Sequence, residues 1–441
     1  MITRERIMTI SKLAIPVAIA LSSNLVMSLI DLAMVGTLGN TTIAAVGLAT
    51  FSSTLIMAFA MGIEPAVQGL VARRRGEGSA EPKCLSLNGG LMIALLMGVP
   101  LTIFCYLLAP SFFSLISPDP EVTKIGVPFL RTLYLGIVAV GMNSAFYGHW
   151  AGMEKPRVYM SIALFANCLH IFLNYVLMFG HLGAPALGAQ GAAVSTLLSH
   201  YMGVIINFAI LYFGFREEGF LRAKPGRDLL SRIFKLAMPA SMQEFMMTAG
   251  YVVFFWMIGQ IGTTELAAAN VIVRVTMILL LLSMSMGDAS ATLVSRTLGE
   301  GDLEKASQWG WDAGKLGVIG ITLIGLPLFL FPKLFLSIFL SDPYAISLAT
   351  TPLRIVGVTA GIASLVNIFA YTLYSVGDGN RVMLVGFSTT WLFFLPGVWI
   401  VGPYLRYGLL QIFLVQLAYS LLANVLLTSI WVGGRWKKIK I

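Results

Sequence analysis

Apolar segments separated by short polar connections dominate this sequence. In the first half they cover approximately residues 11–35, 43–71, 87–111, 125–148, 158–180 and 189–214, and in the second half 235–259, 266–295, 316–340, 345–375, 382–402 and 407–433. About 20 apolar residues suffice for an α-helix to cross the hydrocarbon core of a bilayer. The pattern therefore predicts an all-α membrane protein with twelve transmembrane helices.

The two halves of the chain repeat each other. Residues 12–16 read Lys-Leu-Ala-Ile-Pro and residues 235–239 read Lys-Leu-Ala-Met-Pro. The same offset of 223 aligns further charged residues, glycines and prolines, and after a one-residue slip an offset of 224 takes over: Arg73/Arg296, Glu77/Glu300, Pro120/Pro343, Asn143/Asn367 and Arg157/Arg381. Shared hydrophobicity would not make such residues coincide, so we infer a duplication.

The duplication predicts a domain organisation. Residues 1–214 form an N-lobe of six helices, 215–234 a cytoplasmic linker, and 235–441 a C-lobe of six helices. Because six is even, both repeats insert with the same orientation, and they relate by an axis along the membrane normal. Matched halves of this kind usually face each other across a transport pathway.

Charge placement orients the chain in the membrane. Hydrophobic residues make up 57% of the sequence and charged ones 11%, with a net charge of +9. Most Lys and Arg residues, 23 of 29, fall on alternate connections and on the two tails. This is the positive-inside pattern with both termini cytoplasmic, and it argues against nucleic-acid binding. We also expect no cleaved signal, because the first apolar segment continues past Asp31.

The three cysteines change little in this picture. Cys84, Cys105 and Cys168 are too few and too scattered for a disulfide framework or a metal site. We expect no metal and no cofactor.

Ionisable residues inside the apolar segments are the candidate functional groups: Asp31, Glu64, Glu244, Arg274 and Asp288. Each costs at least a few kcal/mol within a bilayer and marks a pathway, a proton relay or a paired structural site. Asp31 is the most informative, because the offset of 223 pairs it with Phe254. An acid present in one repeat only indicates a specialised lobe, although a helix cap or a local pair is the structural alternative.

Polar residues on the fifth and sixth helices extend this set. Asn167, His170 and Asn174 recur at spacings of three and four, which places them on one face of a helix. Thr196 and His200 lie on the next helix. Hydrogen bonds between membrane helices are the alternative explanation for all of these residues.

Two prolines, and three charged residues in the second half of the chain, are the remaining candidate functional residues. Pro16 precedes Asp31 on the same helix and Pro239 repeats it, so a helix bend belongs to both repeats, either as a hinge or as a static kink. Arg274 and Asp288 are 14 residues apart, about 21 Å along one helix, and cannot pair directly. Glu244 and Arg274 either pair with each other or belong to an electronegative cavity for cationic substrates.

Several motifs resemble the multidrug and toxic compound extrusion (MATE) family. They are Pro16 and Asp31, Gly76-Glu-Gly78, Gly299-Glu-Gly301-Asp, Gly152-Met-Glu-Lys-Pro156, His-Ile-Phe-Leu-Asn-Tyr at 170–175, Leu187-Gly-Ala-Gln-Gly-Ala-Ala-Val-Ser-Thr196 and Leu266-Ala-Ala-Ala-Asn270. Their order and spacing across two repeats make the match specific. The resemblance implies a V-shaped, bilobed twelve-helix antiporter that exports amphipathic and often cationic compounds in exchange for protons or sodium ions.

The resemblance also assigns roles to residues. The family's first-lobe acid falls on Asp31, and other family positions fall on His170, Asn174 and Thr196. With His for Asn and Asn for Asp, one carboxylate remains, which weakens a sodium site that needs several hard oxygen ligands. The second-lobe acid of some sodium-coupled members has no match, although Asn367 lies near its position and Glu244 lies one turn from their seventh-helix acid.

These observations predict a monomeric, proton-coupled multidrug exporter in a bacterial-type cytoplasmic (inner) membrane, and not an enzyme. A sodium-coupled exporter of the same fold is the main alternative. A lipid-linked oligosaccharide flippase would need a strongly basic central cavity. Arg274 is a single basic residue within the apolar segments and gives little support for such a cavity. A membrane-embedded transferase or protease would need a reactive cluster on long loops, and the loops here are short.

Overall fold

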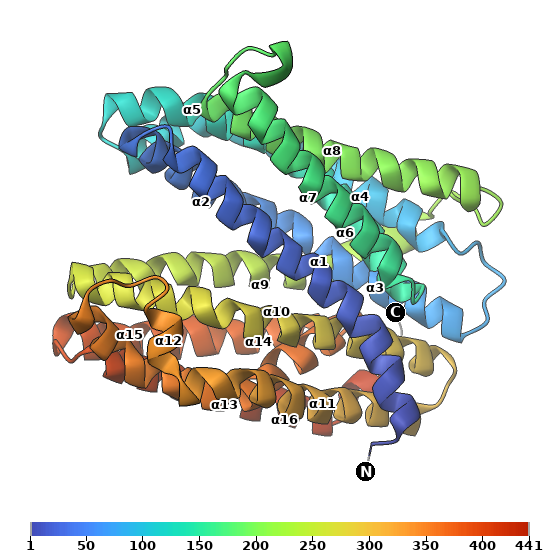
Figure 1. Ribbon diagram of the computed structural model, residues 1–441. Helices are drawn as coiled ribbons and strands as arrows, with labels where there is room; N and C mark the ends of the chain where they lie inside the picture. The colour runs from blue at the N-terminus through green and yellow to red at the C-terminus, as the bar shows by residue number, and fades with distance from the viewer. Residues whose placement is uncertain (1, 440–441) are drawn as a thin grey trace. The chain divides into compact units, whose positions relative to one another are not determined.

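The computed structural model describes residues 2–439, and their regular structure is helical (Figure 1). The α-helices of the first half are α1 (Arg4–Gly36), α2 (Asn40–Met61), α3 (Ile63–Gly76), α4 (Leu85–Ile116), α5 (Pro120–Tyr134), α6 (Ile137–Gly152), α7 (Pro156–Phe179) and α8 (Ala189–Gly214). Those of the second half are α9 (Arg227–Gly259), α10 (Thr263–Gly299), α11 (Leu303–Leu330), α12 (Pro332–Leu336), α13 (Pro343–Ser375), α14 (Gly379–Phe387), α15 (Leu395–Trp399) and α16 (Leu409–Val432). Short 3₁₀ and π segments complete them: η1 (His181–Gly183), η2 (Ser388–Phe394), η3 (Ile400–Tyr404) and η4 (Arg435–Lys438).

The helices confirm the all-α membrane architecture. Within residues 2–439, eleven helical stretches are long and apolar enough to cross a membrane. The position of the remaining predicted segment, 235–259, is occupied by α9, which is 33 residues long. Gln243 and Glu244 lie in its middle and make it less apolar than the others. Together the twelve stretches correspond to the twelve predicted segments.

Several helices extend beyond the predicted segments into the charged residues beside the apolar run. The predicted segments begin at 11, 235 and 316, whereas α1 begins at Arg4, α9 at Arg227 and α11 at Leu303, which is seven, eight and 13 residues earlier. The hydrophobic pattern limits a predicted segment to the apolar residues. A helix also includes neighbouring charged residues, as long as its backbone hydrogen bonds are made. Residues 227–234 of the predicted linker are consequently the first turns of α9.

Contacts divide the chain into two compact units. The first, called here the N-unit, runs from Ile19 to Phe245, and the second, the C-unit, combines the residues up to Ala18 with those from Met246 onward. Both divisions fall inside helices, one in α1 and one in α9. Each of these two helices therefore contributes to both units, whereas the lobes at 1–214 and 235–441 remain a prediction from the repeat.

The duplicated charges adopt the same local geometry in both repeats. Arg73 Nε lies 3.6 Å from Glu77 Oε1, and Arg296 Nε lies 3.1 Å from Glu300 Oε1, one helical turn apart in each case. The next residue is Gly78 in the first repeat, with φ at 61°, and its counterpart Gly301 has φ at 82°. Such angles favour glycine, so the repeat preserved both the ion pair and the residue that ends the helix.

The same holds for the helices that follow. Asp119 accepts a hydrogen bond from the Glu121 amide at the start of α5, and Asp342 accepts one from the Tyr344 amide at the start of α13. A proline follows each aspartate at the first helical position, where its missing N–H is not needed. The two repeats thus begin corresponding helices with the same cap.

The connection between α8 and α9 is anchored to the N-unit by one buried side chain. Asn88 on α4 donates to the carbonyls of Gly219 and Ala223 at 2.9 and 2.8 Å. The Leu221 amide donates back to Asn88 Oδ1 at 3.2 Å. The connection is therefore packed against α4 and is not a free tether.

The beginning of α1 is fixed within the C-unit. Arg6 forms an ion pair with Asp312 of α11 and donates to Gln308 Oε1 at 2.9 Å. Its guanidinium lies 4.7 Å from the centre of the Trp309 ring. These three contacts hold the part of α1 before Pro16 against α11.

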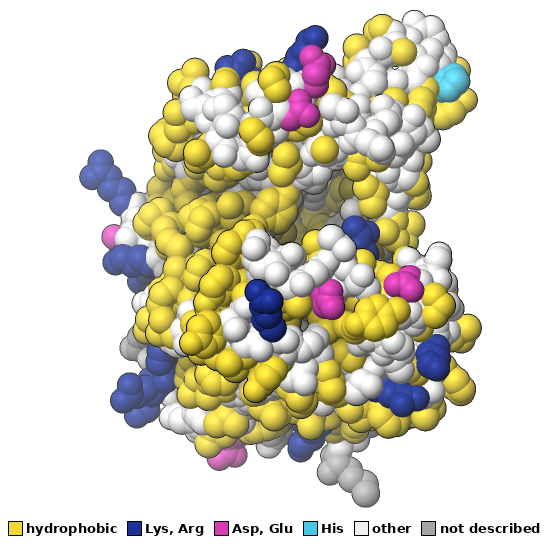
Figure 2. Space-filling view, turned by 90° about the vertical axis from the view of Figure 1, so that its left-hand side faces the viewer, with side chains coloured by type: hydrophobic (Ala, Val, Ile, Leu, Met, Phe, Trp, Pro, Cys, Tyr) yellow, Lys and Arg dark blue, Asp and Glu magenta, His cyan; other side chains and the backbone are white. Residues whose placement is uncertain are grey.

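The surface is apolar, as expected for a protein solvated by lipid. Large hydrophobic side chains such as Phe213, Leu115 and Leu107 are 85%, 83% and 66% exposed. Figure 2 shows hydrophobic side chains over most of the face in view, with charged ones scattered among them. An apolar surface of this extent suits a bilayer rather than water.

Candidate functional site

The polar residues of α1 and α7 meet along one line of contact within the N-unit. Asn167 Nδ2 donates to Ser23 Oγ and to Asn24 Oδ1, both at 2.8 Å. Two turns further along each helix, Asp31 of α1 reaches Asn174 of α7. The contact points advance by seven or eight residues along both helices in the same direction, so α1 and α7 run parallel. The equal spacing of the polar residues on the two helices therefore brings these residues into contact.

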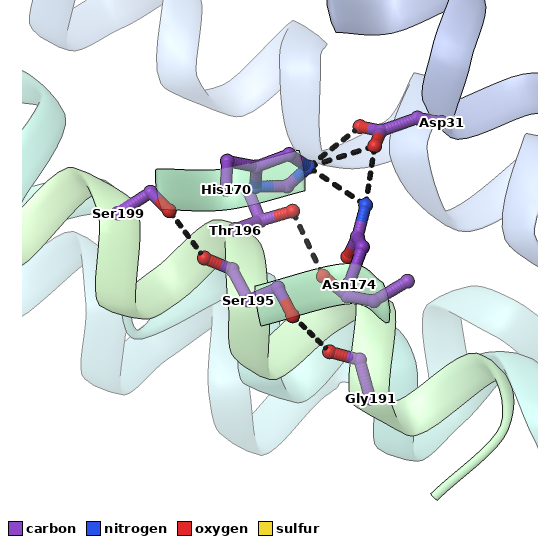
Figure 3. Close-up of polar contacts among 8 residues, drawn as sticks. Asp31, His170, Asn174, Gly191, Ser195, Thr196 and Ser199 are labelled. Atoms are coloured by element: carbon purple, nitrogen blue, oxygen red, sulfur yellow. Dashed lines mark hydrogen bonds and ion pairs between the residues drawn. The ribbon is translucent and has the colours of Figure 1, made fainter. Parts of the chain in front are cut away.

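The centre of this line is a three-residue cluster (Figure 3). His170 Nε2 lies 2.8 and 2.9 Å from the two carboxylate oxygens of Asp31. Asn174 Nδ2 donates to Asp31 Oδ1 at 2.5 Å and lies 3.1 Å from His170 Nε2. The structure thus brings together three of the four residues that the sequence proposed for coupling.

These distances correspond to a hydrogen bond between the imidazole and the carboxyl group. A carboxylate and an unprotonated imidazole nitrogen are both acceptors, so at 2.8 Å one proton lies on His170 Nε2 or on an oxygen of Asp31. Moving it from one to the other changes the charge of both groups and needs no movement of the helices. A role of this pair in proton coupling stays a prediction.

Burial is uneven across the cluster. The side chains of His170 and Asp31 are 2% and 28% exposed, and Asn174 is fully buried. The carboxylate is therefore the most accessible group of the cluster, while the imidazole and the amide contact it from the interior.

The atoms directed at Asp31 are nitrogen atoms. His170 contributes Nε2 and Asn174 contributes Nδ2, whereas the buried Oδ1 of Asn174 makes no hydrogen bond in the described chain. Sodium ions are bound by oxygen ligands, several at a time. No group of three His, Cys, Asp or Glu residues between residues 2 and 439 could hold a metal ion.

Thr196 lies on the neighbouring helix α8, and its hydroxyl donates to the Ala192 carbonyl at 3.0 Å (Figure 3). Its neighbours Ser195 and Ser199 bond in the same way to the carbonyls four residues earlier. The helix backbone thus satisfies these hydroxyls, and a role for Thr196 in coupling stays a prediction.

The second-half candidates do not form one cluster. Glu244 belongs to the N-unit, whereas Arg274, Asp288 and Asn367 belong to the C-unit. Arg274 is exposed on α10, and Asp288 is buried on the same helix. Asn367 Nδ2 donates to Ser283 Oγ at 3.1 Å. Their proposed roles in a substrate site stay predictions.

Comparison with known proteins identifies the family to which this chain belongs. The pattern of the MatE family matches residues 16–176 and 239–400. The two matched segments begin 223 residues apart and end 224 residues apart, which are the offsets of the internal repeat. The chain belongs to the MatE family. It is a multi-pass membrane transporter of this family, as its motifs indicated.

Individual relatives are more distant. A "Probable multidrug resistance protein NorM" of Thermotoga maritima is 25% identical over 97% of this chain and 92% of its own length. A protein with the same description from Rhizobium meliloti is 28% identical over 88% of each chain. A solved structure titled "Outward-facing conformation of a multidrug resistance MATE family transporter of the MOP superfamily" shares the fold, with a TM-score of 0.87 at 22% identity over 98% of this chain and 94% of that chain.

Some polar residues of this MatE protein were not predicted from the sequence. Ser23 and Asn24 are the α1 partners of Asn167, and their signal was the polar run Ser-Ser-Asn within an apolar segment. The Arg6–Asp312 pair had no comparable signal, because its partners are 306 residues apart.

Pro16 and Pro239 both lie inside long helices of this MatE protein. The division between the units falls two residues after Pro16, between Ala18 and Ile19. Replacing Pro16 with Ala restores a backbone donor and favours a straight helix. We expect Pro16→Ala to slow transport roughly fivefold, equivalent to about 1 kcal/mol in the rate-limiting step, with little change in melting temperature.

The matched control is Pro239→Ala, in a helix whose residue corresponding to Asp31 is Phe254. Initial efflux rates and thermal unfolding of the two purified variants should be compared. Equal losses of rate in both variants would assign the prolines a shared scaffold role and remove the hinge hypothesis.

Proposed function

We propose that this chain is a proton-coupled exporter of amphipathic and cationic compounds. The observation that carries the proposal is the cluster of Asp31, His170 and Asn174, in which His170 Nε2 lies 2.8 Å from a carboxylate oxygen of Asp31 and Asn174 Nδ2 donates to the same oxygen. Membership of a transporter family and similarity to proteins described as multidrug resistance proteins support the substrate class.

Donor chemistry favours the proton over sodium. Two nitrogen atoms are directed at Asp31, and N–H donors repel a cation that approaches the same oxygens. Binding sodium there would require both side chains to turn away and several oxygen ligands to replace them. Binding a proton requires neither change.

The cycle has three steps in this proposal. A proton from the outside neutralises the Asp31–His170 pair, which removes the attraction of its carboxylate for a cationic substrate and releases it. The uncharged cluster lowers the barrier to rearranging the helices around it, because a buried charge is costly in an apolar environment. Loss of the proton to the inside restores the negative carboxylate and allows the next substrate to bind.

The placement of Lys and Arg residues supports the orientation of the chain in the membrane. We place the protein in a bacterial-type cytoplasmic (inner) membrane as a monomer, with both termini and the linker at 215–234 on the cytoplasmic side. Lobes at 1–214 and 235–441 are the duplicated parts. Pro16 and Pro239 provide bends, and Glu244, Arg274, Asp288 and Asn367 are candidates for substrate contact.

The ion is tested in vesicles containing the purified protein, by following efflux of the fluorescent cation ethidium. We expect efflux to persist in sodium-free medium under an imposed pH gradient. We expect it to fall to background when nigericin dissipates that gradient in potassium medium. The reason is that a single titrating carboxylate responds to proton concentration and has too few oxygen partners for sodium.

A sodium gradient imposed at fixed pH is the matched control. Loss of efflux on removing sodium alone would overturn the proton assignment in favour of a sodium-coupled exporter. Absence of ethidium efflux under either gradient, combined with translocation of a lipid-linked oligosaccharide, would favour the flippase alternative.

A further inference from the structure

The C-unit contains a cavity of about 380 Å³ that none of the proposed coupling residues reaches. Its walls come from α9, α10, α13, α16 and the π-helical segment η2. Phe254 and Phe394 form part of the lining, with ring centres 5.3 Å apart. Tyr419 extends this aromatic wall, with its ring centre 5.1 Å from that of Phe394.

The repeat relates this wall to the coupling cluster of the N-unit. The offset of 223 pairs Asp31 with Phe254, and the offset of 224 pairs His170 with Phe394. Asp31 and His170 are hydrogen-bonded in one unit, and Phe254 and Phe394 are in ring contact in the other. The duplicated scaffold thus makes the same side-chain contact twice, once between ionisable groups and once between aromatic rings.

The cavity offers hydrogen bonds without charge. Asn367, Thr390 and Gln416 line it, and the buried Oε1 of Gln416 has no hydrogen-bond partner within the described chain. Among residues 2–439, no Asp, Glu, Lys, Arg or His side chain belongs to the lining.

We propose that this cavity is a second binding site, which takes uncharged, flat aromatic compounds with hydrogen-bonding groups. The aromatic wall would stack against the ring system, and Gln416 Oε1 would accept a hydrogen bond from the ligand. A cation would lose its hydration in this cavity without gaining a counter-charge, so a charged ligand is disfavoured. The cavity volume lies within the range typical of small-molecule sites.

The π-helical segment supports a ligand site independently of the repeat. η2 (Ser388–Phe394) contributes both Thr390 and Phe394 to the lining. The corresponding residues of the first repeat lie within α7, a regular α-helix. π-Helical turns are rare and occur frequently at functional sites, because they re-aim side chains at the expense of regular hydrogen bonding.

The test uses two probes with the same ring frame, acridone, which is uncharged, and 10-methylacridinium, which carries a fixed positive charge. Equilibrium dialysis against the purified full chain measures binding of each, in an Asp31→Asn background that removes the carboxylate of the other unit. Transport is not required, so the result does not depend on the proposed coupling. We expect acridone to bind at least tenfold more tightly than 10-methylacridinium.

Neighbouring positions on α13 provide matched variants. Ala363 lines the cavity, and Ile362 is 50% exposed on the same helix. We expect Ala363→Phe to weaken acridone binding at least tenfold by filling the cavity, and Ile362→Phe to leave it unchanged. If Ala363→Phe does not fold, Gln416→Leu replaces it, with an expected loss of about fivefold from one hydrogen bond.

Equal weakening by Ala363→Phe and Ile362→Phe would overturn the proposal, because it would indicate partition into detergent or a site elsewhere. Tighter binding of 10-methylacridinium than of acridone, lost in Ala363→Phe, would overturn the assignment to uncharged ligands. Unchanged acridone binding in both Ala363→Phe and Gln416→Leu would likewise exclude this cavity as the site.

Discussion

Efflux driven by a pH gradient falls to background in the Asp31→Asn variant, while the protein remains folded and inserted. This is the largest functional effect that we expect from a single substitution. The amide of the new side chain is close to isosteric with the carboxylate, so packing against His170 and Asn174 changes little. It still accepts a hydrogen bond from His170 Nε2 and can donate one to Asn174 Oδ1, which has no partner in the native cluster. The substitution removes the negative charge and the exchangeable proton.

Two measurements in parallel check this expectation, ethidium efflux and proton movement in the same vesicles. Ser23→Ala is a suitable control, because Ser23 lies on the same face of contact but carries no titratable group. Asn167 retains Asn24 as a partner in that variant, and we expect near-native efflux. Wild-type rates of efflux in Asp31→Asn would exclude Asp31 as the coupling residue.

The largest effect on stability is expected at Gly62, where α9 passes against the junction of α2 and α3 within the N-unit. A Cβ atom added at Gly62 would lie 2.3 Å from the backbone nitrogen of Ser241 and 2.6 Å from the Ala237 carbonyl oxygen. Backbone atoms of a packed helix cannot move aside cheaply. We therefore expect Gly62→Ala to destabilise the protein by about 1–3 kcal/mol, the usual range for overpacking, and to lower the melting temperature.

Gly47→Ala on α2 is the matched control for this steric argument. A Cβ atom at Gly47 meets no other atom within 4 Å, and alanine is the better helix former by about 0.5–1 kcal/mol. Thermal unfolding of both purified variants should shift in opposite directions. A melting temperature for Gly62→Ala that equals or exceeds the native one would show that α9 is free to move away from Gly62.

The sequence predicted local features of the fold and the site more readily than long-range ones. Helical spacing alone placed Asn167, His170 and Asn174 on one face, and the cost of an isolated carboxylate in a membrane indicated that Asp31 needed partners. Asp31 contacts His170 and Asn174 because α1 and α7 lie parallel. The spacing of residues within one helix does not determine how two helices pack. Thr196 illustrates the limit, because a threonine hydroxyl can bond to its own helix as easily as to a neighbour.

The cavity of the C-unit had no local signal in the sequence. Its lining comes from five separate elements, and most of the lining residues are ordinary apolar or aromatic residues of membrane helices. The π-helical turns of η2 and η3 also escape a pattern search, since they differ from an α-helix by only one residue per turn. The internal repeat gave one indication of a difference between the halves, because Phe254 occupies the position that corresponds to Asp31.

The division of α1 and α9 between the units has a consequence for assembly during synthesis. The N-unit needs α9 up to Phe245, so its packing is incomplete until the ribosome has passed the linker. The C-unit includes the first residues of the chain, up to Ala18, which are synthesised first. Arg6 cannot form its ion pair with Asp312 until α11 has been synthesised. A gene cut within the linker would therefore yield two fragments that complement each other when co-expressed, and neither fragment alone would complete a unit.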